Sequence, residues 1–387
     1  MENLIRFDFQ SYPFDFSEVW LSTVIIFIFG IYINRKIFKS ITWIFFIALI
    51  KSLIFTIYFV IYFDGTYTSG FDDHYYLSKG LSLINELRDT PFNEINYFHA
   101  AEGMHFIYVC VSAFAQYTLG EGYYALVAIN IVISFFCGRV AYLIIYLKHN
   151  NKSLARLFAT SFILYPDLIA YSSVFAGKDV LVLLAHLLII YSFLRVSLSD
   201  FRMGYTIGAI TLLSTVFLRF YVPIIFLSLI IFRMNKLKLI LMSIPIIFLL
   251  WYFGIINNLT DLYSEGVENI VQSNTKFVYL PYDVLHFWLT PRPFYEDPIL
   301  EFTLIANIFN WCIFPVFIYG FYLALKSNDK FVRFLCYYFL AFSIFYGLVD
   351  YLNGPRHRLQ LIFAIIYFIW IGFGGMKLIP SRLKIKN

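Results

Sequence analysis

Long apolar runs follow one another along the whole sequence, separated by short polar or basic segments. A membrane-spanning helix needs about 20 predominantly apolar residues, and about eleven runs here approach that length. Only 14% of the residues are charged, whereas soluble proteins average about 25%. The sequence therefore predicts an all-α polytopic membrane protein, folded as a single integral membrane domain over residues 1–387, and excludes a water-soluble enzyme.

We expect about 11 transmembrane helices from these runs. They cover residues 19–33, 41–63, 123–147, 157–176, 180–196, 205–217, 220–232, 237–256, 302–326, 331–349 and 357–376. A shorter run at 105–119 is expected to be an outer half-helix that does not cross the membrane. The runs at 205–217 and 220–232 meet at Arg219, and their pattern fits either two thin spans or one broken helix.

The charges predict the orientation, because Lys and Arg are enriched in the cytoplasmic loops of membrane proteins. With the N-terminus outside, most of the 29 Lys and Arg residues fall in inner segments and nearly all of the 24 acidic residues fall outside them. The sequence thus predicts a multi-pass protein of the inner (plasma) membrane with a cytoplasmic C-terminus. Its basic residues are spread over the loops, so the lipid bilayer is the expected partner and nucleic acid is not.

Two outer segments are too long to be simple connections. Residues 64–122 form the first outer loop, which is expected to carry interfacial helices, and residues 257–301 form the second. Long connections inside a compact domain are usually functional. We therefore expect the chemistry of this protein at the outer face.

Two adjacent carboxylates, Asp72 and Asp73, stand in the first outer loop. Such a pair can act as a general base or hold a divalent cation such as Mg²⁺ or Mn²⁺. Tyr76 and Gly80 follow at helical spacing, which predicts an amphipathic interfacial helix over about 74–88. The alternative interpretation is that the two acids only complement the dipole at the start of that helix.

A charged pair, Lys178-Asp179, stands at the outer junction of two predicted spans. It fits a site residue pair or a plain solvated turn. Asp167 falls within a span, where an ionisable group is costly and usually faces a cavity or a partner. Lys51 and Arg139 also fall near mid-membrane, where they need partners or an aqueous cleft. They could lie against each other or against Asp167, and we expect a structural ion pair, for which Asp167 is the available acid.

Two arginines, Arg356 and Arg358, precede the last predicted span on the outer side, where positive charge is disfavoured. A phosphate or pyrophosphate at the headgroup level would offset that preference, because guanidinium forks match its oxygens. Lys178, Arg219 and Arg292 are expected on the same face. The alternative is that these side chains snorkel to lipid phosphates.

The order of these motifs resembles the GT-C superfamily of membrane glycosyltransferases, which use lipid-phosphate-linked sugars. It is similar to bacterial protein O-mannosyltransferases and lipid A aminoarabinose transferases. The motifs are Asp72-Asp73 with Tyr76 and Gly80, the segment Gly103–Tyr108, Tyr165-Pro166, Ser172-Ser173, Lys178-Asp179, Pro291–Phe294 and Arg356-His357-Arg358.

The resemblance implies an inverting glycosyltransferase that moves a sugar from a polyprenyl-phosphate donor to a glycan, lipid or protein acceptor at the outer face. It implies that Asp72, Asp73 and Asp179 are catalytic, with Asp72 as the general base. A divalent cation on Asp72 and Asp73 is the one candidate cofactor. The implied substrate-binding residues are Tyr76, His105, Lys178, Arg219, Arg292, Arg356 and Arg358.

Two other functions remain open from the sequence. An O-antigen or capsule polysaccharide polymerase would use a diphosphate-linked glycan at the same face. Such polymerases depend on arginines in large outer loops, and Arg292 in the second outer loop leaves this function open. A lipid or solute transporter is the third, because Lys51, Arg139 and Asp167 lie within the membrane. Transporters often contain internal repeats and broken helices, and the sequence shows no clear repeat.

Overall fold

The computed structural model describes residues 13–63, 72–89, 105–219, 221–231, 276–290, 302–348 and 355–374. Over these residues every regular element is a helix, and no strand is present. The all-α class predicted from the sequence is therefore confirmed for this part of the chain. In order, the helices are α1 (Phe16–Asn34), α2 (Ile41–Ile57), the π-helical turn η1 (Tyr58–Tyr62), α3 (Asp72–Asp89), α5 (Phe106–Leu119), α6 (Tyr123–His149), α7 (Lys152–Ile163), α8 (Pro166–Ser173), α9 (Asp179–Ser197), α10 (Phe201–Val216), α11 (Tyr221–Ile231), α14 (Lys276–Leu289), α15 (Leu304–Leu325), α16 (Lys330–Leu348), α17 (Pro355–Arg358), the 3₁₀ turn η5 (Leu359–Leu361) and α18 (Ile362–Gly372).

Six of these helices are long and apolar enough to cross a membrane: α1, α2 with η1, α6, α9, α15 and α16. The helices α7 and α8 count as a seventh span if the bent pair crosses as one unit. The described residues thus supply six or seven candidate spans, and the predicted count of about 11 is not confirmed. The run at 237–256 lies outside the described residues.

The difference arises where apolar runs are interrupted by turns. Residues 205–232 form two helices, α10 and α11, that end and begin on either side of Arg219. Both interpretations that the sequence left open for that run, two thin spans and one broken helix, include such a break. Similarly, the last run is divided into α17, η5 and α18, and only α18 continues as a regular apolar helix. The half-helix expected at 105–119 is α5, which is 14 residues long.

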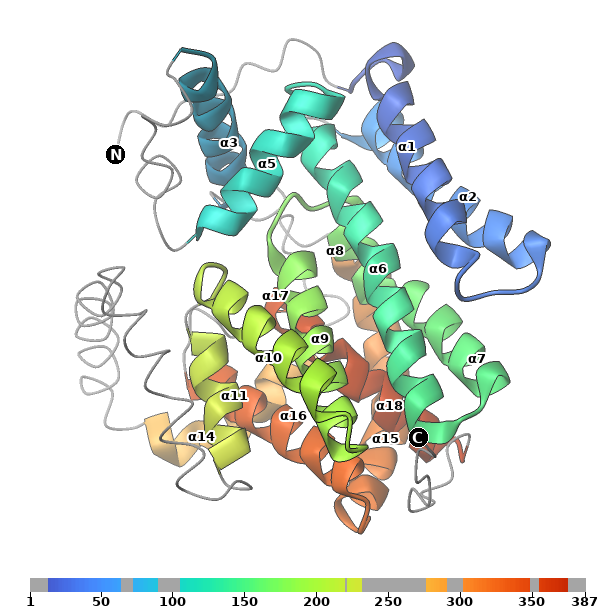
Figure 1. The fold of residues 1–387 in the computed structure, drawn as a ribbon, viewed down its shortest axis with the longest axis vertical. Coiled ribbons are helices and arrows are strands. Elements are labelled where there is room, and N and C mark those ends of the chain that lie inside the picture. Colours follow the sequence, from blue (N-terminus) through green and yellow to red (C-terminus); the bar gives the residue numbers. More distant parts are fainter. Residues whose placement is uncertain are drawn as a thin grey trace.

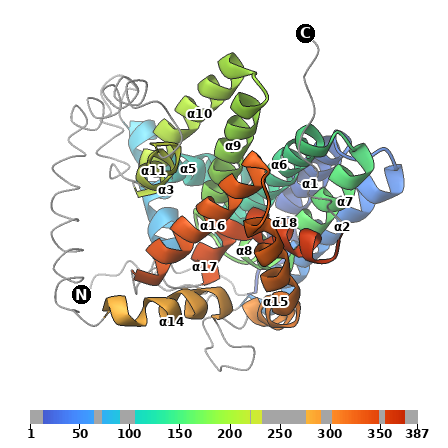
Figure 2. The same ribbon diagram turned by 90° about the horizontal axis from the view of Figure 1, so that it is seen from below.

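The arrangement centres on α6, which runs along the long axis of the molecule (Figure 1). Helices α1, α7 and α9 pack against it, and α2 packs on α1. The helices α3 and α5 lie at the end of the molecule where α6 begins, while α10, α11, α16 and α18 lie toward its other end (Figure 1). Helix α14 lies beside α16 and α17 at the edge of the molecule (Figure 2).

The segment that the sequence predicts to be the first outer loop includes a packed helix pair. Helix α3 corresponds to the amphipathic helix predicted at about 74–88. It packs along α5. Gly80 makes the close approach possible, because a Cβ at this position would lie 2.5 Å from Ser112 Oγ and 2.9 Å from the backbone nitrogen of Ala113. Gln116 Nε2 donates a hydrogen bond to the Leu77 carbonyl at 2.8 Å, which fixes the register of the pair.

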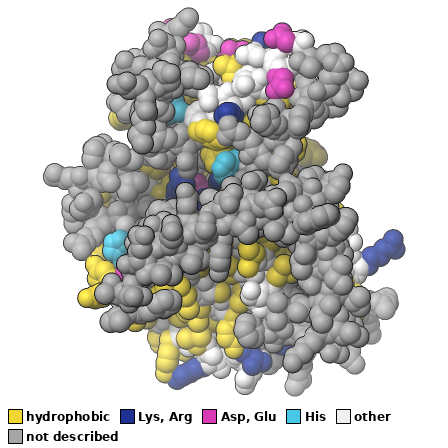
Figure 3. Space-filling model, turned by 90° about the vertical axis from the view of Figure 1, so that its left-hand side faces the viewer, with side chains coloured by type: hydrophobic (Ala, Val, Ile, Leu, Met, Phe, Trp, Pro, Cys, Tyr) yellow, Lys and Arg dark blue, Asp and Glu magenta, His cyan; other side chains and the backbone are white. Residues whose placement is uncertain are grey.

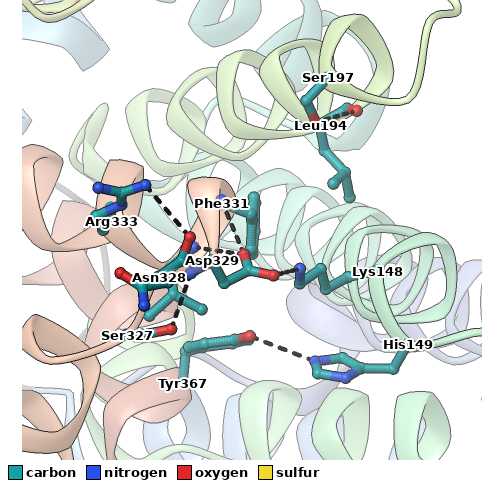
Figure 4. A network of polar contacts seen from close by, with 11 residues as sticks. Lys148, His149, Leu194, Ser197, Ser327, Asn328, Asp329, Phe331, Arg333 and Tyr367 are labelled. Atoms are coloured by element: carbon teal, nitrogen blue, oxygen red, sulfur yellow. Dashed lines mark hydrogen bonds and ion pairs between the residues drawn. The ribbon is translucent and has the colours of Figure 1, made fainter. Parts of the chain in front are cut away.

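At the opposite end of α6, polar contacts join three helices and a loop (Figure 4). Lys148 forms a buried ion pair with Asp329, which precedes α16. The Asp329 carboxylate also accepts from the backbone N–H groups of Phe331 and Val332, so it caps α16. The neighbouring His149 contacts the Tyr367 hydroxyl of α18 at 3.3 Å. These contacts hold α6, α16 and α18 together on the side that the charge distribution predicts to be cytoplasmic.

Candidate functional site

The backbone between α8 and α9 sets the position of Lys178 and Asp179. Buried side chains of α5 and α6 hold this backbone by hydrogen bonds, and therefore the charged pair is presented from a fixed turn. Asn130 Nδ2 donates to the carbonyls of Phe175 (3.1 Å) and Gly177 (3.0 Å), Tyr108 Oη donates to the carbonyl of Ala176 (3.0 Å), and the Ala176 N–H donates to Tyr123 Oη (3.1 Å).

Asp179, the first residue of α9, accepts a hydrogen bond from Arg219 Nη2 in an ion pair whose side chains are only 2% and 5% exposed. Arg219 lies in the turn between α10 and α11, and its Nη1 donates to Tyr221 Oη at 2.6 Å. The charges neutralise each other where no water can solvate them, which is the usual condition for burying an ion pair. Both terminal nitrogens of Arg219 are therefore engaged by protein groups.

A second buried ion pair joins Arg358 of α17 to Asp167 of α8, with 3.4 Å between Nη2 and Oδ1. Arg358 Nη1 donates to the carbonyls of Trp288 (3.1 Å) and Thr290 (2.7 Å) at the end of α14. Asn310 Nδ2 of α15 donates to the other Asp167 oxygen at 2.8 Å. The ion pair and these hydrogen bonds thus hold four helices together, and they engage both terminal nitrogens of Arg358.

Lys178 connects this region to the α3–α5 pair. Its Nζ lies 2.8 Å from His105 Nδ1 and 5.4 Å from the centre of the Tyr76 ring. The Tyr76 and His105 rings meet edge to face with centroids 5.4 Å apart. Lys178 therefore joins the turn before α9 to α3 and to the start of α5.

We call six residues the polar centre: Asp167, Lys178, Asp179, Arg219, His357 and Arg358. Each is at most 7% exposed. His357 belongs to α17, outside the candidate spans. Burial lowers its pKa well below the ordinary value, and the positive charges of Arg219, Arg356 and Lys178 lower it further. The imidazole is therefore neutral. On the face shown in Figure 3, a few Lys, Arg and His side chains are visible at mid-height, and other Lys and Arg side chains lie near the lower edge.

One small cavity lies next to the polar centre, and a larger one adjoins it. The small one, of about 20 Å³, is lined by Arg358, Asn310 and Trp288 together with apolar side chains of α15 and α16. The larger one, of about 400 Å³, lies between the α7–α8 bend, α15 and α18, and its lining is mainly apolar. Tyr165 and Ile313 line both cavities. The larger apolar cavity therefore adjoins the small one at the edge of the polar centre.

The structure brings together most of the residues that the sequence singled out for the site. Tyr76, His105, Lys178, Asp179, Arg219 and Arg358 belong to this set of contacts, and Arg356 is half-buried beside His357. Asp72 and Asp73 begin α3, but their side chains lie outside the described part of the chain, as does Arg292. Within the described ranges no group of three His, Cys, Asp or Glu residues is placed to hold a metal, so the cation on Asp72 and Asp73 stays a prediction.

One prediction about the membrane interior is wrong. Lys51 pairs with neither Arg139 nor Asp167: its Nζ donates to Ser134 Oγ at 2.6 Å and to Ser172 Oγ at 3.2 Å. Asp167 is instead paired with Arg358, and Arg139 donates to the Lys36 carbonyl. Hydroxyl groups within the helix bundle can satisfy a buried lysine without a carboxylate.

Sequence reasoning did not assign Asp167, Tyr171 or His357 to the site. Two signals in the sequence could have assigned two of them to the site. Asp167 is an acid inside an apolar run, and His357 stands between two arginines that are predicted to lie on the outer side. Nothing in the sequence distinguishes Tyr171 from the other 30 tyrosines. Its place near Asp167, Asp179, Arg356 and Arg358 follows only from how α8 packs.

Comparison of the chain with protein-family models, with curated proteins and with solved structures finds no match in any of the three.

Proposed function

We propose that this protein is a membrane glycosyltransferase that moves a sugar from a polyprenyl-phosphate donor to an acceptor hydroxyl at the outer face. The observation that carries the proposal is an apolar cavity that shares Tyr165 and Ile313 with the small cavity lined by Arg358. The cavity between the α7–α8 bend, α15 and α18 suits an isoprenoid chain, and Tyr165 and Ile313 lead from it to Arg358. A lipid tail placed there brings its phosphate to the cations.

In the proposed reaction the acceptor hydroxyl loses its proton and attacks the anomeric carbon. The bond from that carbon to the lipid phosphate breaks, the phosphate leaves with the electron pair, and the anomeric configuration inverts. Asp72 is the proposed base. Cations held in place beside the phosphate stabilise its developing charge, which is usually the largest contribution in such a step. Asp179 is engaged by Arg219, so it orients that arginine rather than accepting the proton.

A substitution at Ile313 tests the lipid path. Ile313→Trp fills the junction of the two cavities. Each methylene kept out of an apolar site costs about 0.8 kcal/mol, so excluding two or three raises the KM for a long-chain donor about tenfold or more. The measurement is sugar transfer by the protein in vesicles supplied with a polyprenyl-phosphate sugar.

Ile318→Trp is the matched control, since Ile318 lies on the same helix and is 37% exposed. Its KM should equal that of the unaltered protein. An unaltered KM in Ile313→Trp would place the lipid elsewhere. Absence of transfer by the unaltered protein, with glycolipids and surface glycans identical in cells with and without the gene, would refute the proposed function.

One observation favours the transporter as a second candidate. The axes of α7 and α8 meet at 52° inside the apolar region, and broken helices of this kind often line transport sites. Lys51 is fully buried nearby, hydrogen-bonded to Ser172 of α8. Uptake or flipping of a labelled polyprenyl phosphate by vesicles, without any transfer of sugar, would favour this alternative. A polymerase would instead require a diphosphate-linked glycan as donor.

A further inference from the structure

Three residues of the polar centre and the nearby Tyr171 carry buried polar atoms that have no hydrogen-bond partner. The atoms are Tyr171 Oη, Arg219 Nε, both ring nitrogens of His357 and Arg358 Nε. The four residues are 2%, 6%, 2% and 4% exposed, respectively. These five atoms are a large share of the 13 unpartnered buried side-chain atoms found in the described part of the chain. Buried polar groups are nearly always paired in native proteins, so a concentration of exceptions needs an explanation.

These residues face one region. Tyr171 stands one helical turn after Asp167 on α8, and therefore on the side of that helix that meets Arg358. The ring of His357 stands 5.1 Å from that of Tyr346, whose hydroxyl lies 3.5 Å from the hydroxyl of Tyr221, the partner of Arg219. The unpartnered atoms of α8, α17 and the α10–α11 turn therefore belong to one region around the two ion pairs of the polar centre.

The unpartnered atoms are mainly hydrogen-bond donors. Each arginine offers one Nε–H, the tyrosine offers its O–H, and a neutral imidazole offers one N–H and one acceptor nitrogen. The terminal nitrogens of both arginines are already bound to aspartates, a hydroxyl and backbone carbonyls. A group with several acceptor oxygens and negative charge fits this set, and a phosphate has those properties.

We infer that Tyr171 and His357 bind the phosphate of the substrate directly, through the tyrosine hydroxyl and a neutral imidazole N–H, while Arg219 and Arg358 contribute only their Nε atoms. This inference rests on the proposed function, because it takes the phosphate-bearing lipid as the ligand. It differs from the expectation that the guanidinium fork of Arg358 holds the phosphate, since the terminal nitrogens of Arg358 bind Asp167 and two backbone carbonyls. Those of Arg219 likewise bind Asp179 and Tyr221.

Tyr171→Phe is the sharpest test, because it removes only an oxygen that has no partner. The ligand-free variant should be at least as stable as the unaltered protein, since an unsatisfied buried hydroxyl is lost. Its affinity for a short-chain polyprenyl phosphate should fall about ten- to a hundredfold, as expected for one hydrogen bond to a charged group. Both are measured by thermal unfolding in lipid nanodiscs over a series of ligand concentrations.

Tyr367→Phe is the matched control. Its hydroxyl has a partner, His149, at the opposite end of α6, so this variant should lose stability and keep its affinity. His357→Gln retains a neutral donor and should bind with an intermediate affinity, whereas His357→Leu should bind as weakly as Tyr171→Phe. The corresponding polyprenol, which lacks the phosphate, should bind all variants equally, and inorganic phosphate shows how much affinity comes from the head alone.

Unchanged polyprenyl-phosphate affinity in both Tyr171→Phe and His357→Leu would overturn the inference, and sugar transfer by the unaltered protein would then leave the proposed function standing. Conversely, phosphate binding that depends on Tyr171 in a protein that transfers no sugar would keep the binding site and refute the proposed function. A marked loss of ligand-free stability in Tyr171→Phe would also overturn the inference, because it would mean that the hydroxyl has a structural partner.

Discussion

Three ion pairs of this protein are almost completely buried, with every side chain at most 5% exposed: Asp167–Arg358, Asp179–Arg219 and Lys148–Asp329. Desolvation makes such pairs weak sources of net stability, but removal of one partner leaves an uncompensated buried charge and is costly. Their main effect here is geometric, because each pair joins segments that are more than 35 residues apart in the sequence. Two of the pairs shape the polar centre, and the third stabilises the opposite end of α6.

Asp329→Asn tests how much the Lys148–Asp329 ion pair contributes to the free energy of unfolding. The asparagine keeps an oxygen for the N–H groups of Phe331 and Val332, so the cap on α16 survives while Lys148 loses its counter-ion. We expect the free energy of unfolding to fall by about 3 kcal/mol, measured by unfolding in detergent. Asp200→Asn is the control: its pair with Arg195 is partly exposed and should contribute at most about 1 kcal/mol.

The lowered pKa of Asp329 predicts that the protein loses stability in acid. Burial alone would raise the pKa of Asp329, but the hydrogen bond and charge of Lys148, with two backbone N–H groups, lower it below the ordinary value. A carboxyl whose pKa is lowered by folding contributes stability above its unfolded pKa of about 4, and this contribution is lost as the pH falls through the folded pKa. Asp329→Asn should lack this component of acid destabilisation; equal acid sensitivity in both proteins would contradict the assignment.

At the scale of elements, the bend between α7 and α8 creates the apolar cavity. Pro166 occupies the first position of α8, where its missing N–H costs nothing. It also forces Tyr165 into an extended conformation (ψ 131°), so that α7 cannot continue. The bend exposes Tyr165 and Pro166 to the larger cavity and places Asp167 one residue further on, facing Asn310 and Arg358. One proline thus shapes both the cavity and the start of the polar centre.

Helices α3 and α5 must stay in close contact to present Tyr76 and His105 to Lys178. Gly80→Val should separate them, because a Cβ at this position meets Ser112 and the Ala113 backbone at less than van der Waals distance. We expect faster amide hydrogen exchange in α3 and α5, with α15 and α18 unchanged, and loss of sugar transfer. Asn85→Val introduces the same side chain at an exposed position of α3 and should change neither. Unaltered exchange in Gly80→Val would show that the pair tolerates a side chain there.

At the scale of the whole molecule, α6 provides a direct test of orientation, because it runs from the α3–α5 end to the Lys148 end (Figure 1). Glu121 and Asn151 flank it and are both exposed. In a background with Cys312→Ser, we expect Glu121→Cys to react with an impermeant thiol reagent from outside, and Asn151→Cys to react only after the membrane is opened. The basic segments at the Asn151 end require this, since positive charge stays on the cytoplasmic side. The reverse labelling would move the polar centre to the cytoplasmic half.

For three long runs, the sequence by itself determined where a helix lies and nearly where it ends. The apolar runs at 123–147, 180–196 and 302–326 correspond to α6, α9 and α15 to within two residues. This success has a local cause, because backbone hydrogen bonds within each apolar segment must be satisfied internally when no water is present. The residue types at the candidate site were also visible, since charged groups in or beside apolar runs are rare and stand out.

Only the tertiary structure decided which charges meet. Asp167 pairs with Arg358 across 191 positions, and Asp179 with Arg219 across 40, while Lys51 is satisfied by serines of two other helices. These partners depend on how helices pack and on where they bend or stop, as at Pro166 and Arg219. Helix packing is set by side-chain shape summed over many contacts, so no spacing in one segment encodes it. For the same reason, the sequence indicated Arg356 and Arg358 for a phosphate, and the fold committed the terminal nitrogens of Arg358 to Asp167 and to two backbone carbonyls.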